Sequence, residues 1–276
     1  MHGWNKVPHS LLPHMTEWNA AEYSRRSSLQ EAMAQEVLAL LDLKGSERIL
    51  DVGCGDGKIT AEIASRAPQG SVVGVDPSRD MISFAQSRFG PATRSNLRFE
   101  VADARCLPFQ REFDLVVSFN ALHWVPEQDA ALGSIHSALI SGGRAQLRLV
   151  ARGARKSLEN VAEEIRRTSK WSDYFRDFHD PYLHLTSDEY AAMAERNGFR
   201  VLGVNTRDHA WDFGSHAAFS AFTAVGCVEW TRRLPEAERP EFINDVVDRY
   251  RAVAADGSGE ENTFKFYQMD ISLLAI

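Results

Sequence analysis

Arg48 to Gly57 reads RILDVGCGDG, an apolar run that leads directly into three alternating glycines. The apolar residues predict a short buried strand. The glycines predict a tight turn in which the backbone comes close to a ligand, because they carry no Cβ atom. Apolar residues at helical spacing follow from Ile59 to Ala64. The stretch therefore predicts a strand, a loop and a helix, the arrangement in which open α/β sheets bind nucleotides.

The spacing of the glycines separates two classes of nucleotide-binding protein. The dinucleotide fingerprint G-x-G-x-x-G needs a glycine where this chain has Lys58, which disfavours a nicotinamide dehydrogenase. Instead, Asp51 stands two positions before the pattern Gly53-x-Gly55-x-Gly57. This pattern resembles the first motif of the class I S-adenosylmethionine-dependent methyltransferases.

A second apolar run, Val72 to Val75, ends in Asp76, which lies roughly 20 residues beyond the loop. An acid at this place is suited to accept hydrogen bonds from both hydroxyls of a ribose. The alternative is that Asp76 only caps the next helix, which Pro77 and Ser78 are expected to open as turn and cap residues.

A third predicted strand, Leu97 to Val101, is followed by Ala102, Asp103 and Ala104. Adenine presents an exocyclic amine donor beside a ring acceptor. The resemblance implies that the Asp103 carboxylate meets the amine and that the backbone amide of Ala104 meets the ring nitrogen.

The resemblance further implies S-adenosyl-L-methionine as the methyl donor, S-adenosyl-L-homocysteine as the product, and no metal ion. Tyr23 is expected to lay its ring against the sulfonium, a contact worth about 0.5–2 kcal/mol; packing on the first helix is the alternative for this ring. Asn120 is expected near the methionine portion. The complete predicted cofactor set is Tyr23, Arg26, Asp51, Gly53, Cys54, Gly55, Asp76, Pro77, Met81, Ala102, Asp103, Ala104 and Asn120.

Strand patterns recur about every 20 to 25 residues, which predicts right-handed crossovers and a doubly wound α/β sheet. A fourth strand is predicted at Phe113–Ser118, a fifth at Ala145–Val150, a sixth at Phe199–Asn205 and a last at Phe264–Leu274. The family topology adds that the last strand lies antiparallel beside the fifth. The predicted fold is a mostly parallel seven-stranded sheet, the Rossmann-like methyltransferase fold, with helical lid insertions.

The chain divides into a tail and one domain. Residues 1–17 mix histidines and prolines and predict a flexible N-terminal tail. Residues 18–276 are predicted to form the methyltransferase domain. Within it, the segments at about 151–185 and 209–259 are longer than ordinary loops and have helical patterns. They are predicted to pack together as a lid over the strand ends.

Length and composition favour a catalytic domain. The 276 residues are 44% hydrophobic, enough to bury a large core. The formal net charge is −7 and no basic run stands out, which favours a small-molecule acceptor over nucleic acid. No stretch is long and apolar enough to predict a membrane span. Three cysteines without paired spacing predict reduced thiols in the cytoplasm. The oligomeric state is left open.

The segment NALHWV, Asn120 to Val125, follows the fourth strand, where the reacting methyl group is expected. Together with Trp18, Asn19 and Tyr23 upstream, it resembles the trans-aconitate and juvenile hormone acid methyltransferases, which esterify free carboxylates. At position 123 the first type has glutamine and the second histidine, so the resemblance leaves the particular acid open.

His123 and Trp124 are the predicted catalytic residues. A carboxylate is ionised at neutral pH and needs no general base, so both side chains are expected to donate hydrogen bonds to one oxygen while the other attacks. Alternatively, His123 is a general base with a pKa near 6.5 that serves methylation at another oxygen, nitrogen or carbon. His123 and Trp124 are each also compatible with a structural role. Besides a methyltransferase and a nicotinamide dehydrogenase, the third class of protein considered is a non-catalytic one that binds S-adenosylmethionine.

Overall fold

A single seven-stranded sheet organises the part of the chain that the computed structural model describes, residue 33 and residues 36–276. Its strands are β1 (Arg48–Val52), β2 (Ser71–Asp76), β3 (Leu97–Val101), β4 (Phe113–Phe119), β5 (Leu139–Ala151), β6 (Phe199–Asp212) and β7 (Thr263–Ala275). The predictions for Trp18, Asn19, Tyr23, Arg26 and the tail at 1–17 lie outside the described residues.

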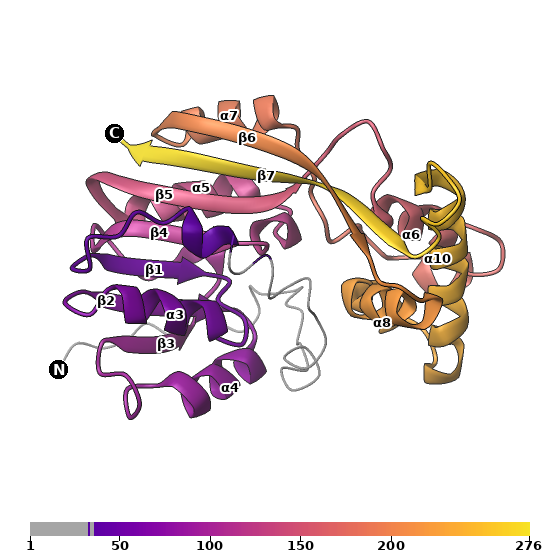
Figure 1. Ribbon diagram of the computed structural model, residues 1–276, viewed down its shortest axis with the longest axis horizontal. Coiled ribbons are helices and arrows are strands. Elements are labelled where there is room, and N and C mark those ends of the chain that lie inside the picture. The colour runs from indigo at the N-terminus through magenta and orange to yellow at the C-terminus, as the bar shows by residue number, and fades with distance from the viewer. Residues whose placement is uncertain (1–32, 34–35) are drawn as a thin grey trace.

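The strands lie in the order β3-β2-β1-β4-β5-β7-β6 (Figure 1). Every neighbouring pair from β3 to β5 is parallel, and β7 runs antiparallel between β5 and β6. This order confirms the predicted doubly wound, mostly parallel sheet and its antiparallel last strand. The winding reverses between β1 and β4, and open α/β sheets bind ligands at such a switch point.

Helices cover the sheet and also form a second body beyond it. Against the sheet lie α3 (Lys58–Arg66), α4 (Arg79–Phe89), α5 (Gln128–Ala138) and α7 (Ser187–Arg196), with the 3-10 turns η2 (Ala104–Cys106) and η3 (Leu122–Trp124). The second body contains α6 (Leu158–Arg166), η4 (Ser172–Phe175), α8 (His216–Gly226), α9 (Val228–Thr231), η5 (Glu236–Glu238) and α10 (Arg239–Ala254). Among residues 33 and 36–276, no helix has the length and apolarity needed to cross a membrane.

Both faces of the sheet are buried, as the continuous apolar runs of its parallel strands require. Ile49 on β1 belongs to the apolar layer that includes α3 and α4, whereas the next residue, Leu50, belongs to the layer on the opposite face that includes α5 and α7. Burying one such side chain contributes about 1.5–3 kcal/mol. The two apolar layers therefore hold β1 and β4 at the centre of the sheet, where the glycine loop emerges.

The sixth strand is longer than predicted. The sequence predicted an end at Asn205, but β6 continues to Asp212 and stays paired with β7 up to Thr263. The added part alternates between exposed and partly buried residues and has no apolar run of its own, so its pairing with β7 defines it as a strand. The β6–β7 ribbon thereby extends beyond the sheet to the second body (Figure 1).

The second body is built from both long segments between strands. Trp171 comes from the first segment and Trp230 from the second, and both are buried in one aromatic cluster. Their indole N–H groups donate in opposite directions: Trp171 to Asp245 on α10 at 2.8 Å, and Trp230 to Glu163 on α6 at 2.9 Å. The two segments are therefore interlocked by apolar packing and by two reciprocal hydrogen bonds.

A buried ion pair joins β5 to β7. Arg148 and Asp270 are register partners, and the Arg148 side chain is 0% exposed. Its Nε and Nη2 atoms donate to the two carboxylate oxygens at 2.6 and 2.9 Å. Such a two-point contact fixes direction as well as distance, so the pair aligns the antiparallel strand against the parallel part of the sheet.

Asp270→Asn is expected to lower the free energy of unfolding by about 3–5 kcal/mol, because it leaves the buried guanidinium with the exposed Glu36 as its one remaining counter-charge among the described residues. Urea denaturation measures this loss. Glu100→Gln is the matched control: its exposed pair with Arg98 should contribute less than about 1 kcal/mol. Equal losses in the two variants would contradict the role given to the buried pair.

Candidate functional site

The glycine loop connects β1 to α3 and is held against β2. The backbone amides of Gly53 and Cys54 both donate to the carbonyl of Val75, at 2.8 and 3.0 Å. Gly53, Gly55 and Gly57 have φ angles of 77°, 53° and 79°. Residues with a Cβ rarely adopt this left-handed conformation, so the turn requires glycine at all three positions.

The space around the three glycines differs. A Cβ atom at Gly53 would lie 2.2 Å from the Cβ of Ala121, and one at Gly57 would lie 2.7 Å from the Cβ of Ala85. A Cβ at Gly55 would meet none of the described residues within 4 Å. Gly53 and Gly57 therefore allow the loop to pack against the protein itself, and Gly55 is the glycine that faces open space suited to a ligand.

Asp76, at the end of β2, contacts the same loop. Its carboxylate accepts from the backbone amides of Gly55 at 3.1 Å and of Ser78 at 2.9 Å. Ser78 caps α4, as predicted, by accepting from the amide of Met81 at 3.3 Å. Pro77 lies between Asp76 and Ser78, so Gly55, Asp76, Pro77 and Met81 of the predicted cofactor set meet at the ends of β1 and β2. The contact of Asp76 with a ribose stays a prediction.

Two buried side chains support the loop: Asp51, on β1, and Cys54, within the loop itself. Asp51 is 2% exposed and accepts a hydrogen bond of 2.7 Å from the Thr60 hydroxyl on α3. Burial raises the pKa of Asp51 to about 7, and the charge of Asp76 acts in the same direction. Burial also raises the pKa of the Cys54 thiol well above its usual range. Asp51 thus joins β1 to the helix after the loop, and Cys54 fills space as a protonated thiol.

Asp103, at the end of β3, forms an ion pair that the sequence did not predict. Arg105 donates to its two carboxylate oxygens through Nε at 3.0 Å and Nη2 at 2.6 Å, and to Glu127 through Nη1 at 3.0 Å. Ala102 donates to the carbonyl of Asp76 at 3.2 Å, which brings this strand end to the others. The predicted adenine contacts of Asp103 and Ala104 stay predictions.

Asn120 turns the chain at the end of β4. It has a φ of 57°, and its backbone amide donates to the carbonyl of Arg148 at 2.7 Å. Its side-chain Oδ1 is buried and has no hydrogen-bond partner among the described residues. A buried acceptor of this kind is costly unless a ligand or water completes it, which fits the predicted role of Asn120 toward the methyl donor.

His123, on η3, is surrounded by the aromatic rings of Trp124, Tyr182 and His184. Its ring is 6% exposed and stacks on Tyr182 with 5.8 Å between ring centroids, while Trp124 packs on the same tyrosine at 4.0 Å. The amide of Val150 donates to His123 Nδ1 at 3.4 Å. Burial, with a smaller effect from His184, lowers the pKa of His123 to about 3. The ring is therefore neutral at pH 7, with Nε2 carrying the hydrogen.

A cavity of about 210 Å³ lies beside this aromatic group. The end of β5, the start of α6, residues 180–184 and the start of β7 line it. Tyr182 and His184, which the sequence analysis did not assign to the site, form its wall toward His123. The charged lining residues are Arg152, Arg155, Lys156, Glu159, Asp180 and Lys265.

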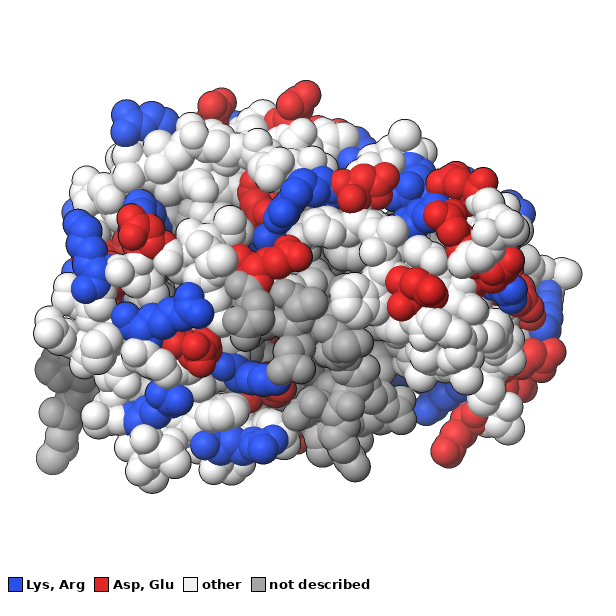
Figure 2. Space-filling model, viewed as in Figure 1, with Lys and Arg blue, Asp and Glu red and all other residues white. Residues whose placement is uncertain are grey.

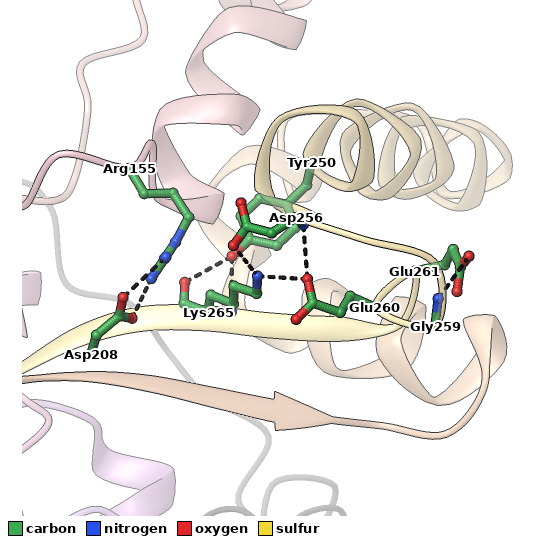
Figure 3. A network of polar contacts seen from close by, with 8 residues as sticks. All are labelled: Arg155, Asp208, Tyr250, Asp256, Gly259, Glu260, Glu261 and Lys265. Carbon is green, nitrogen blue, oxygen red and sulfur yellow. Dashed lines mark hydrogen bonds and ion pairs between the residues drawn. The ribbon is translucent and has the colours of Figure 1, made fainter.

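The cations of this cavity are paired with carboxylates that do not line it. Arg155 binds Asp208 on β6, and the buried Lys265 donates to Asp256 at 2.6 Å and to Glu260 at 2.7 Å (Figure 3). Tyr250 strengthens this junction, because its hydroxyl bonds both backbone groups of Lys265. The cavity wall is therefore polar, and the positive charges of Arg155 and Lys265 are balanced by carboxylates outside the cavity.

The residues at the strand ends fit a nucleoside-bearing methyl donor. Gly55 leaves room for close approach, and the unpartnered Asn120 Oδ1 offers an acceptor to an ammonium group. In the described part of the chain, no group of three His, Cys, Asp or Glu side chains is placed to hold a metal ion. Cys54, Cys106 and Cys227 are free thiols.

Comparison with known proteins identifies the family of this chain. A methyltransferase-domain family matches residues 49–143. A trans-aconitate 2-methyltransferase of Streptomyces avermitilis is 30% identical over 64% of this chain and 67% of its own. A juvenile hormone acid O-methyltransferase of Drosophila melanogaster is 27% identical over 74% and 71%. The chain belongs to the class I S-adenosylmethionine-dependent methyltransferases, in the group that contains these two enzymes.

A solved structure extends the likeness to the fold. A phosphoethanolamine N-methyltransferase of Haemonchus contortus, in complex with S-adenosyl-L-methionine, has a TM-score of 0.62 at 15% identity. The match covers 98% of this chain and 60% of that one. This likeness supports the fold. The cofactor follows from the family: as a class I S-adenosylmethionine-dependent methyltransferase, the enzyme uses S-adenosylmethionine and forms S-adenosylhomocysteine.

Asp76→Ala is expected to weaken the binding of S-adenosylhomocysteine at least tenfold, because it removes both a potential ribose acceptor and the anchor of the Gly55 amide. Isothermal calorimetry measures the Kd. Asp80→Ala, an exposed acid in the first turn of α4, is the matched control and should leave the Kd unchanged. An unchanged Kd in the Asp76 variant would remove this residue from the cofactor site.

Asp51→Asn is expected to change how stability depends on pH. The folded carboxyl keeps its proton up to about pH 7, whereas the unfolded one loses it near 3.8. Between these values the folded state binds more protons, so this group makes the free energy of unfolding fall as pH rises. Urea denaturation at pH 5 and pH 8 should show a smaller fall in the variant than in the wild type. An equal fall would mean that Asp51 is ionised at neutral pH.

Proposed function

We propose that this enzyme transfers the methyl group of S-adenosylmethionine to the free carboxylate of a small molecule. The observation that carries the proposal is the state of His123: its Nδ1 accepts from the Val150 amide, and burial keeps the ring neutral. A histidine in this state is poorly suited to remove a proton at neutral pH. It is well suited to donate one hydrogen bond from Nε2.

The chemistry of a carboxylate matches such a site. When bound, S-adenosylmethionine supplies a methyl carbon that is attacked in line with its bond to sulfur. An acceptor with a pKa near 4 is already ionised at neutral pH. His123 and Trp124 donate to one of its oxygens and leave the other to attack, so positioning and the exclusion of water provide most of the rate enhancement.

Several further observations support a small acid as the acceptor. The two named relatives are a trans-aconitate and a juvenile hormone acid methyltransferase. Lys and Arg are interspersed with Asp and Glu on the face drawn in Figure 2, unlike the continuous basic face that nucleic acids require. We assign the segments at about 151–185 and 209–259 as the lid that excludes water, and the cytoplasm as the compartment.

The test identifies the chemical nature of the methylated product and measures kcat for two variants of His123. The wild type, given methyl-labelled S-adenosylmethionine and a panel of organic acids, should form a product that releases labelled methanol in mild alkali. His123→Leu should lower kcat about 100-fold, the usual cost of losing one such donor. His123→Gln keeps a donor and should stay within about tenfold of the wild type.

A general base would give a different result. The rate should be flat from about pH 5.5 to 8.5 if His123 only donates, because its pKa lies near 3. A fall in rate below pH 7 in the wild type, together with an inactive His123→Gln variant, would favour the base and a hydroxyl acceptor. Label that is stable in alkali would exclude the ester. Donor binding without any transfer would favour the non-catalytic class.

A further inference from the structure

Four buried polar atoms that have no hydrogen-bond partner among the described residues gather on β6, at one edge of the sheet, and on β7 beside it. They are both amide atoms of Gln268, Nε of Arg207 and Nε2 of His209. Gln268 lies on β7 and is 0% exposed, and the other two residues lie on β6. Most buried polar groups in proteins are paired, so a cluster of unpaired ones indicates a missing partner.

The strand register places these atoms close together. Gln268 lies directly opposite Arg207 on one side and Val150 on the other. Opposed residues of an antiparallel pair have Cβ atoms about 5 Å apart. His209 is opposite Phe266 and stacks on its ring at 5.4 Å. Because side chains alternate along a strand, all five residues share one face of the sheet.

This face adjoins the site of methyl transfer. The backbone amide of Val150 donates to Nδ1 of His123 at 3.4 Å. Gln268 on β7 is the register partner of Val150 on β5, so Gln268 lies on the strand next to the one that contacts the predicted catalytic histidine. Val150 and Phe266 also line the 210 Å³ cavity beside His123. Gln268, Arg207 and His209 do not line this cavity themselves. Gln268 and His209 adjoin it through Val150 and Phe266, beside the space in which an acceptor would be held.

The charges around Gln268 determine what kind of group fits. Arg207 donates to Asp270 at 3.1 Å and lies 3.7 Å from Glu36, and Arg148 binds both of these acids. Two cations thus face two anions. A second carboxylate would enter this partly buried cluster without a counter-charge, which is strongly unfavourable. An uncharged group that both accepts and donates hydrogen bonds would instead complete Gln268 without adding charge.

We propose that Gln268, with Arg207 and His209, binds an uncharged polar group at the far end of the acceptor. The acceptor is then a monocarboxylic acid that also carries a carboxamide or a hydroxyl. Its carboxylate meets His123, and its second group accepts from Arg207 Nε and Gln268 Nε2 and donates to Gln268 Oε1. This inference rests on the proposed carboxylate acceptor and specifies its class.

The test compares acids of equal length by calorimetry, using the full-length enzyme loaded with S-adenosylhomocysteine. Three sets of four to six carbons each contain a straight-chain monoacid, its diacid and its monoamide: for five carbons, pentanoate, glutarate and glutaramate. In at least one set, the monoamide should bind tenfold more tightly than both others. Equal affinities within every set, a preference for the diacid, or no binding would overturn the inference.

Two glutamine variants separate recognition from structure. Gln268→Met keeps the volume and removes the unpaired amide, so it should abolish the preference for the monoamide and raise Tm. Gln146→Met is the matched control, because Gln146 lies on β5 of the same sheet and is already paired with Ser272 at 2.5 Å. It should keep the preference and lower Tm. A preference that persists in Gln268→Met would remove this residue from the site.

Failure of the proposed function would look different. If the monoamide preference is present and depends on Gln268, yet no acid in the panel is methylated, the binding site stands and the carboxylate chemistry is wrong. If acids are methylated without any preference, the chemistry stands and the inference about Gln268 is wrong.

Discussion

The close approach of Gly53 to Ala121 is the contact on which the arrangement of this site depends. It brings the loop after β1, which carries the predicted cofactor residues, against the segment after β4, which carries His123 and Trp124. A Cβ at Gly53 would force these loops apart. Methyl transfer needs donor and acceptor in line and in contact, so this spacing constrains every other part of the mechanism.

The buried polar groups of the site share one electrostatic property. Beneath the glycine loop the pKa of Asp51 is raised to about 7, and beside the 210 Å³ cavity the pKa of His123 is lowered to about 3. Both result from burial, which disfavours the charged form of an acid and of a base alike. The charges that remain in the site, such as Asp76 and Asp103, are each held by hydrogen bonds or an ion pair.

The β6–β7 ribbon links the site to the second body. It is anchored in the sheet by the Arg148–Asp270 pair and ends among the aromatic side chains of α8 and α10. Lys265 and Gln268 lie three residues apart on β7, the first at the charged junction of Figure 3 and the second beside Arg207. One strand thus carries both the support of the second body and the residue to which we assign acceptor recognition.

The sequence by itself determined the parallel strands, the glycine loop and the cap of α4 at Ser78, because each depends on neighbouring residues: apolar runs, left-handed glycines and a local hydrogen bond. It also brought Asp51, Asp76, Asp103 and Asn120 to one edge, since parallel strands end together. Pairing between distant segments determined the rest. The extension of β6, the Arg105–Glu127 pair and the neutral state of His123 arise only when β7, the start of α5 and residues 180–184 reach their places. Strand extension and pKa depend on neighbours in space that no local pattern encodes.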